Sequence, residues 1–88
     1  MTPADVLLSP SPWIGGTRLD GTYGPVSVIA YATRGWIAAL EELMDCAQAQ
    51  AAVLGGNVVL GCEISIEPFD TLQCTLTGTA AHLVYLDE

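Results

Sequence analysis

The sequence predicts an α+β domain in which one helix covers one face of an antiparallel sheet, with the elements in the order β-α-β-β. Three observations predict this fold. A β-branched and aromatic segment comes first, a long stretch with helical periodicity follows, and two later segments alternate apolar and polar residues. With 88 residues, the chain is long enough for one such domain.

Residues 1–24 are expected to form an extended arm that precedes the domain at residues 25–88. They hold three of the five prolines and four of the nine glycines, which interrupt helices and long strands. Short extended pieces fit residues 6–8 and the surroundings of residues 17–19, and Trp13 and Ile14 form the apolar anchor of the arm. A frayed terminus is the alternative interpretation.

The segment of residues 25–32 (PVSVIAYA) is typical of a strand. A helix is expected from about Arg34 to Leu54, with its N-terminal cap near Thr33. Gly55 would end this helix, because the residue after a helix often adopts a left-handed conformation that favours glycine.

Residues 57–67 and 72–86 are expected to form a hairpin whose turn is at residues 68–71, where Pro and Asp favour a turn. Alternation along the first strand places residues 58, 60, 62, 64 and 66 on one face, and the helix should cover that face. The predicted core is Val28, Trp36, Leu40, Leu43, Met44, Ala47, Leu54, Leu60, Ile64, Leu76 and Val84.

The predicted helix is apolar over a wider arc than one sheet can cover. Beside its large apolar stripe and a narrow polar stripe runs a second flank of mostly small residues. We expect this flank, with Trp13 and Ile14 of the arm, to contact a neighbouring copy; an alanine-rich helix with exposed methyl groups is the alternative. The flank consists of Gly35, Ala39, Cys46, Ala49 and Val53.

Composition favours a homo-oligomer and excludes several partners. Ten acidic residues stand against two arginines, so the net charge of -8 argues against binding to nucleic acid or to anionic membranes. The apolar runs are too short to span a membrane, and a cytoplasmic location is expected. Half of the residues are hydrophobic and only 14% are charged, which indicates that part of the surface faces another subunit.

The residues capable of metal binding do not form a known zinc spacing. The candidates are Cys46, Cys62, Cys74 and His82. With the hairpin turn near residue 70, Cys62 lies opposite Gly78 and Cys74 opposite Ile66, which separates the two thiols by about 13 Å. These four residues are therefore weak candidates that need a neighbouring chain, and we expect the three thiols to be reduced and unreactive in the folded protein.

Catalytic residues are not indicated by the sequence. His82 lacks an evident nucleophile or acid as partner, and Glu63 and Glu67 lie about 13 Å apart along one strand, too far to act together on one small group. We therefore expect neither an enzyme nor a bound cofactor.

Several short motifs resemble the YbjQ-like family, small bacterial domains often labelled heavy-metal-binding. Residues 54–61 (LGGNVVLG) are similar to that family's LGANAVVG segment, and residues 77–80 (TGTA) are similar to its SGTA. The spacing of Pro12, Gly16, Leu19, Gly24 and Val26 in the arm also matches. The family's longer middle segment is missing here, and its helix is richer in charge.

The resemblance implies a dodecin-like subunit with an antiparallel sheet in the order 1-3-2, assembled as a pentameric ring. It supplies no metal-ligand set that matches particular residues. Three hypotheses for the function follow: a non-enzymatic, self-assembling domain; a module that binds a metal or small ligand at subunit junctions; and a dodecin-like flavin store.

Overall fold

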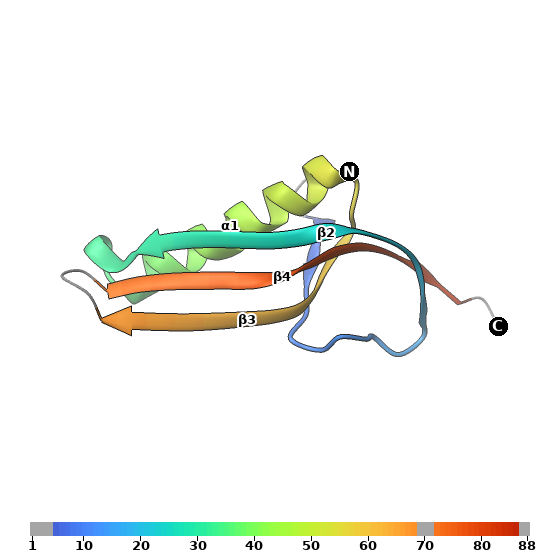
Figure 1. The fold of residues 1–88 in the computed structure, drawn as a ribbon, viewed down its shortest axis with the longest axis horizontal. Helices are drawn as coiled ribbons and strands as arrows, with labels where there is room; N and C mark the ends of the chain where they lie inside the picture. The colour runs from blue at the N-terminus through green and yellow to red at the C-terminus, as the bar shows by residue number, and fades with distance from the viewer. Residues whose placement is uncertain (1–4, 69–71, 87–88) are drawn as a thin grey trace.

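The computed structural model describes residues 5–68 and 72–86, and it has the α+β class that the sequence predicts (Figure 1). One helix packs on one face of a four-stranded sheet. The elements are β1 (Leu7–Leu8), β2 (Thr17–Tyr31), the 3-10 turn η2 (Ala32–Arg34), α1 (Trp36–Leu54), β3 (Val58–Pro68) and β4 (Leu72–Tyr85).

The sheet has four strands and mixed pairing, so the expected three-stranded antiparallel sheet is wrong in strand number and type. Its order is β1-β3-β4-β2. The three long strands are antiparallel neighbours with β4 in the middle, whereas β1 pairs in parallel with the start of β3. Backbone hydrogen bonds hold β1 there, from Leu7 N to Asn57 O (3.1 Å) and from Ser9 N to Val59 O (2.9 Å).

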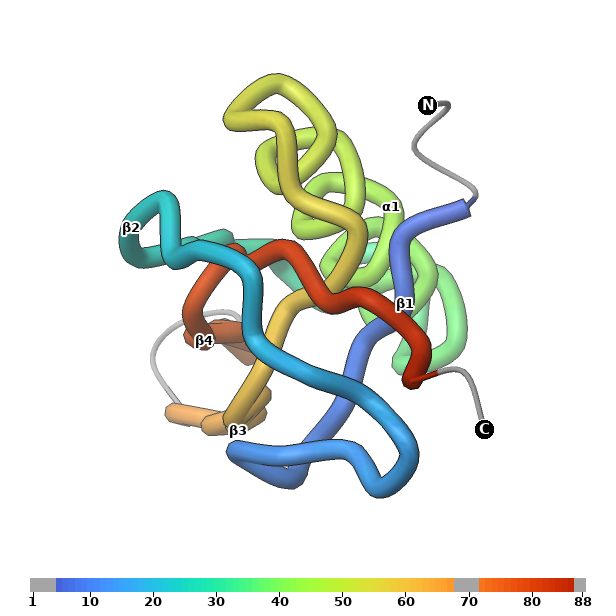
Figure 2. Tube along the Cα trace, turned by 90° about the vertical axis from the view of Figure 1, so that its right-hand side faces the viewer, coloured from blue at the N-terminus to red at the C-terminus, as the bar shows by residue number. Residues whose placement is uncertain are grey.

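Strand β2 is twice as long as expected and includes residues 17–24, which we had assigned to the arm. It pairs with β4 from Thr17 opposite Tyr85 to Tyr31 opposite Gln73. Register irregularities between Leu19 and Gly21 and between Thr22 and Gly24 interrupt the pairing. The glycines that suggested a broken chain therefore sit at bulges, which bend a strand without ending it. The segment before β2 loops past the start of β3 (Figures 1 and 2).

The C-terminal end of α1 agrees with the prediction from the sequence, but its N-terminal cap does not. Gly55 adopts the expected left-handed conformation (φ 93°), and its N–H donates to carbonyls in the last turn of the helix. At the other end the cap is Gly35 (φ 98°) and not Thr33, which belongs to the 3-10 turn. The turn expected at residues 68–71 lies, beyond Pro68, outside the described residues.

The helix buries a line of small residues on either side of Leu43, and its core face is rotated from the predicted one. Trp36, Met44 and Leu54 were expected in the core but are exposed. Alanines at the contact let α1 lie close to the larger side chains of the sheet, such as Val28 and Leu76. The buried helix residues are Ala39, Leu43, Ala47 and Ala51.

A bulge in β3 changes which face its side chains occupy. Leu60 pairs with Thr79, but Glu63 pairs with Thr77, so one extra residue is inserted around Gly61, whose φ is 64°. The predicted single face from residue 58 to residue 66 is therefore wrong. Val58 and Leu60, which precede the bulge, belong to a second cluster on the sheet face away from α1. This cluster consists of Val58, Leu60, Ala81 and Leu83, and Ile14 packs against it.

The rest of the predicted core is largely confirmed. Val28, Leu43, Ala47 and Leu76 are buried beneath α1, and Leu40 and Val84 are half-buried; Leu60 is buried as well, but in the second cluster on the other face. Ile64 is the exception on the sheet. It pairs with Leu76 and so shares the helix face, but α1 packs mainly over β2 and β4 and contacts β3 less, which leaves Ile64 48% exposed.

Candidate interaction site

The structure confirms the predicted strand positions of Cys62 and Cys74, and it places Cys46 at the surface of the helix. Cys74 pairs with Ile66 and is buried, and Cys62 is half-buried with its Sγ next to the backbone of Gly78. Both pack with the core beneath α1. Cys46 is exposed in the single chain, so its own fold does not give this thiol the buried surroundings that were expected to make it unreactive. It lies on the helix flank that the sheet does not cover.

Cys62 is a poor nucleophile in this fold. Its Sγ donates to the carbonyl of Val59 (3.4 Å). Burial raises the pKa of the Cys62 thiol, and a hydrogen bond with the backbone of Ser9 offsets this only in part. The thiolate that would act as a nucleophile or metal ligand is therefore disfavoured at neutral pH.

His82 faces Asp20 across the β2–β4 pair. Its Nδ1 lies 3.3 Å from Asp20 Oδ2, and both side chains are partly exposed. Within the described part of the chain, the Nδ1 atom of His82 is buried and makes no hydrogen bond. His82 is far along the sheet from Cys74, so the fold does not gather the four weak metal candidates. Among residues 5–68 and 72–86, groups of three or more His, Cys, Asp or Glu side chains placed to hold a metal ion are absent.

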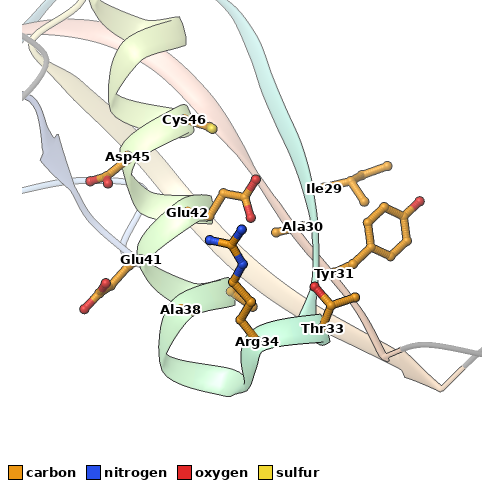
Figure 3. Close-up of a pocket in the computed structure, with 11 residues that line it drawn as sticks. Ile29, Ala30, Tyr31, Thr33, Arg34, Ala38, Glu41, Glu42, Asp45 and Cys46 are labelled. Atoms are coloured by element: carbon orange, nitrogen blue, oxygen red, sulfur yellow. The ribbon is translucent and has the colours of Figure 1, made fainter.

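A groove of about 840 Å³ lies between the first half of α1 and the end of β2 (Figure 3). Ala30 forms its floor with small helix residues, and Cys46 points across it toward β2. Arg34 and Glu42 extend toward each other at its mouth, while Ile29 and Tyr31 point away from the helix. The groove is therefore apolar at its base and charged at its rim.

One wall of this groove is an open strand edge. Strand β2 is the last strand of the sheet. The side-chain amide of Gln50 forms two hydrogen bonds with the outward-facing backbone of Ser27. It accepts from the N–H (3.4 Å) and donates to the carbonyl (3.1 Å). Along an antiparallel strand, the backbone N–H and C=O groups of successive residues point alternately to the two edges. Those of Ile29, two residues after Ser27, therefore also point outward. Outside the strand ladders, the backbone hydrogen bonds of the described residues do not include these Ile29 groups.

Beyond Ser27, the edge of β2 carries none of the usual protection against pairing. Charged side chains and prolines blunt most natural edges. Here residues 21–33 contain no charged residue, and Pro25 is the only proline, located before the open part of the edge. An unprotected edge next to an apolar groove is a surface suited to receive another strand.

The outer flank of α1 continues this surface along the same side of the sheet. Cys46 and Val53 are exposed, Val53 by 87%, and Ala49 is half-buried. Gly35 is exposed at the helix start. Ala39, which was expected on this flank, is instead buried in the core of the single chain because of the rotated helix face.

The two apolar residues of the arm have separate environments. Ile14 packs against the second cluster of its own chain, whereas Trp13 is exposed. The arm lies along the first half of β3, because Gly61 N donates to Ser11 O (3.0 Å) and Cys62 N donates to Ser9 O (2.9 Å). Beyond Cys62, the described residues provide no further strand along this edge of β3.

In the described part of the chain, α1 is the longest helix, and no helix there is apolar enough over a sufficient length to cross a membrane. Comparison with protein-family models yields no match, and neither does comparison with curated proteins. The resemblance to the YbjQ-like proteins therefore stays a prediction.

Proposed function

We propose that this chain is the subunit of a non-enzymatic homo-oligomer whose activity belongs to the assembly. The observation that carries the proposal is the apolar surface that a single copy leaves in water. Fifteen large apolar side chains of the described residues are exposed, among them Trp13, Ile37 and Val53. Such a surface is typical of subunits and not of small monomers.

The total surface and the shape support the same proposal. The chain exposes 5557 Å², whereas a compact monomer of this mass exposes about 4,900 Å². Its radius of gyration is 13.8 Å, against about 12 Å for a compact domain of this length. The extents of 51 × 22 × 20 Å describe an elongated subunit. Association would remove the excess surface from water and contribute hydrophobic stabilisation.

The size and class of the assembly come from the resemblance to the YbjQ-like family. It implies a dodecin-like β-α-β-β subunit and a pentameric ring. A ring forms when one patch of each copy binds a different patch of the next, and the contacts close on themselves. This protein offers two different apolar sides, the flank of α1 beside β2 and the bare face of β3.

Native mass spectrometry of the protein as purified tests the proposal, with light scattering after size-exclusion chromatography as an independent measure. A pentamer has a mass of about 46 kDa, five times the 9.2 kDa of one chain. A different closed ring would support self-assembly and correct the ring size. A 9.2 kDa species at micromolar concentration would refute the proposal. The same spectra report any metal or flavin retained at subunit junctions.

A further inference from the structure

We propose that the open edge of β2 receives the second half of β3 from another copy of this chain, so that the sheet continues from one subunit to the next. This inference rests on the proposed self-assembly and names the surfaces that form it. The contact would be head to tail, with the β2 edge of each copy bound to the β3 edge of its neighbour. The residues concerned are 29–31 of β2, beyond Ser27, and 63–67 of β3.

The two edges are both open and have the same strand direction. β2 and β3 each pair antiparallel with β4, so they run parallel to each other. A neighbour that continues the sheet with its helix on the same face would therefore bring its β3 alongside β2 in parallel. The edge of β3 already accepts a parallel strand in this fold, because Leu7 and Leu8 of β1 pair there with Val58 and Val59. The arm ends its contact at Cys62, which leaves residues 63–67 free for another strand.

The side chains of the two surfaces are complementary. In a continuous sheet, Ile64 and Ile66 of the neighbour would lie on the helix side and enter the groove beneath α1, beside Ala30 and Cys46. These isoleucines are 48% and 51% exposed because no helix of their own chain covers them. The groove provides that cover. Glu63 and Glu67 of the neighbour would stay on the solvent-facing side.

Charge favours this head-to-tail contact over a symmetric pairing of two β2 edges. A two-fold contact would bring two copies of the groove together, with one Glu42 side chain opposing another. Like charges at short range oppose association in a chain whose net charge is already -8. The head-to-tail contact instead places uncharged isoleucines against the groove and an uncharged strand edge. Main-chain hydrogen bonds would supply affinity, and the two isoleucines would supply specificity.

Cysteine cross-linking tests the proposal directly, because Cys46 already lies in the groove and is exposed. We would prepare Ile64→Cys and Ile66→Cys, treat the assembled protein with diamide and analyse it without reductant. Head-to-tail contact predicts a ladder of covalent dimers, trimers and larger species in at least one variant. Ser65→Cys is the matched control, since it lies between the two isoleucines on the opposite face. A second control adds Cys46→Ser, which should abolish the ladder.

A second measurement does not depend on cysteine chemistry. Ile66→Glu places an acid beside Glu42 of the neighbour and should lower the native mass from the ring to monomers, while Glu67→Gln on the other face should leave it unchanged. Adding Glu42→Lys to Ile66→Glu should restore the oligomer. Circular dichroism and thermal melting verify that each variant is folded.

The outcomes separate this inference from the proposed function. A wild-type chain that is monomeric refutes both. A wild-type oligomer without a ladder in either isoleucine variant, or with cross-linking as efficient from Ser65→Cys, overturns the β2–β3 contact and leaves self-assembly standing. Cross-linking that stops at dimers in the isoleucine variants also overturns it, because a head-to-tail contact joins every copy to two others.

Discussion

Gly78 lies where β4 passes directly against the bulged part of β3, and Gly78→Ala should destabilise the fold by steric overlap. A Cβ at this position would lie 2.6 Å from Val59 Cγ1 and 3.0 Å from the carbonyl oxygen of Leu60. Neither atom can move freely, because Val59 is fully buried and the carbonyl belongs to the strand backbone. Overpacking of this kind costs about 1–3 kcal/mol of unfolding free energy.

For a domain of this length, such a loss corresponds to a fall in Tm of roughly 5–15 °C. Thermal melting at one fixed protein concentration measures it, since the Tm of an oligomer depends on concentration. Val59→Ala removes the nearest atom. The loss of unfolding free energy in the double variant should therefore be smaller than the summed losses of the two single variants, by about 1 kcal/mol or more. Gly78→Ala combined with Leu83→Ala should be additive, because Leu83 belongs to the cluster on the other face. An unchanged Tm for Gly78→Ala, or additivity with Val59→Ala, would show that this close approach is wrong.

Three further predictions test the core, the thiols and the pH dependence. Leu43→Ala should lower the unfolding free energy by about 2–5 kcal/mol, whereas Met44→Ala on the exposed side should cost less than half as much; equal losses in thermal melting would contradict the rotated helix face. In native protein dissociated to monomers by dilution, a maleimide should label Cys46 quickly and Cys62 and Cys74 slowly, as peptide mass spectrometry can show. Because the pKa of Cys62 is raised in the folded state, its contribution to stability is complete below the unfolded thiol pKa of about 8.5 and is lost as pH rises through the folded value. Wild-type Tm should therefore fall more between pH 8 and pH 10 than that of Cys62→Ala, and parallel curves would refute the shift.

The order of the long elements could be predicted from the sequence because each has a strong local signal. Helical periodicity with Gly55 at its end fixed α1, and alternation identified the two strands of the hairpin with their register near residue 70. A short extended piece was predicted at residues 6–8, but local patterns could not show that Leu7 and Leu8 pair with β3 as strand β1. It has two residues and depends on backbone hydrogen bonds, which leave no side-chain pattern.

The faces were harder to predict than the elements. Gly61 inserts one residue into β3, and a shift of one residue moves every later side chain to the opposite face of the sheet. The helix face was misassigned because large residues were favoured for the core. Leu43 and Ala47 were correctly predicted to contact the sheet, but Ala39 was assigned to the outer flank, because a small side chain permits close packing and gives only a weak hydrophobic signal.

The candidate interaction site was predictable only in part. The outer flank of α1 was expected from its excess of apolar residues, and Cys46, Ala49 and Val53 do lie outside the helix–sheet contact. The open edge of β2 requires knowledge of the strand order, which no local pattern encodes. The uncharged run at residues 21–33 was the available sequence signal, since an edge strand without charges is uncommon in a monomer.

The dimensions of a helix and a sheet explain why one copy of this fold is incomplete. A helix with its side chains is about 10 Å wide, whereas neighbouring strands lie about 4.8 Å apart, so one helix covers about two strands. In this protein α1 is placed over β2 and β4 and leaves the helix-side face of β3 bare at Ile64 and Ile66. The same displacement carries the outer flank of α1 past the edge of β2 and forms the groove. The bare face and the groove therefore have one cause, and a neighbouring copy that fills the groove with its β3 would cover both.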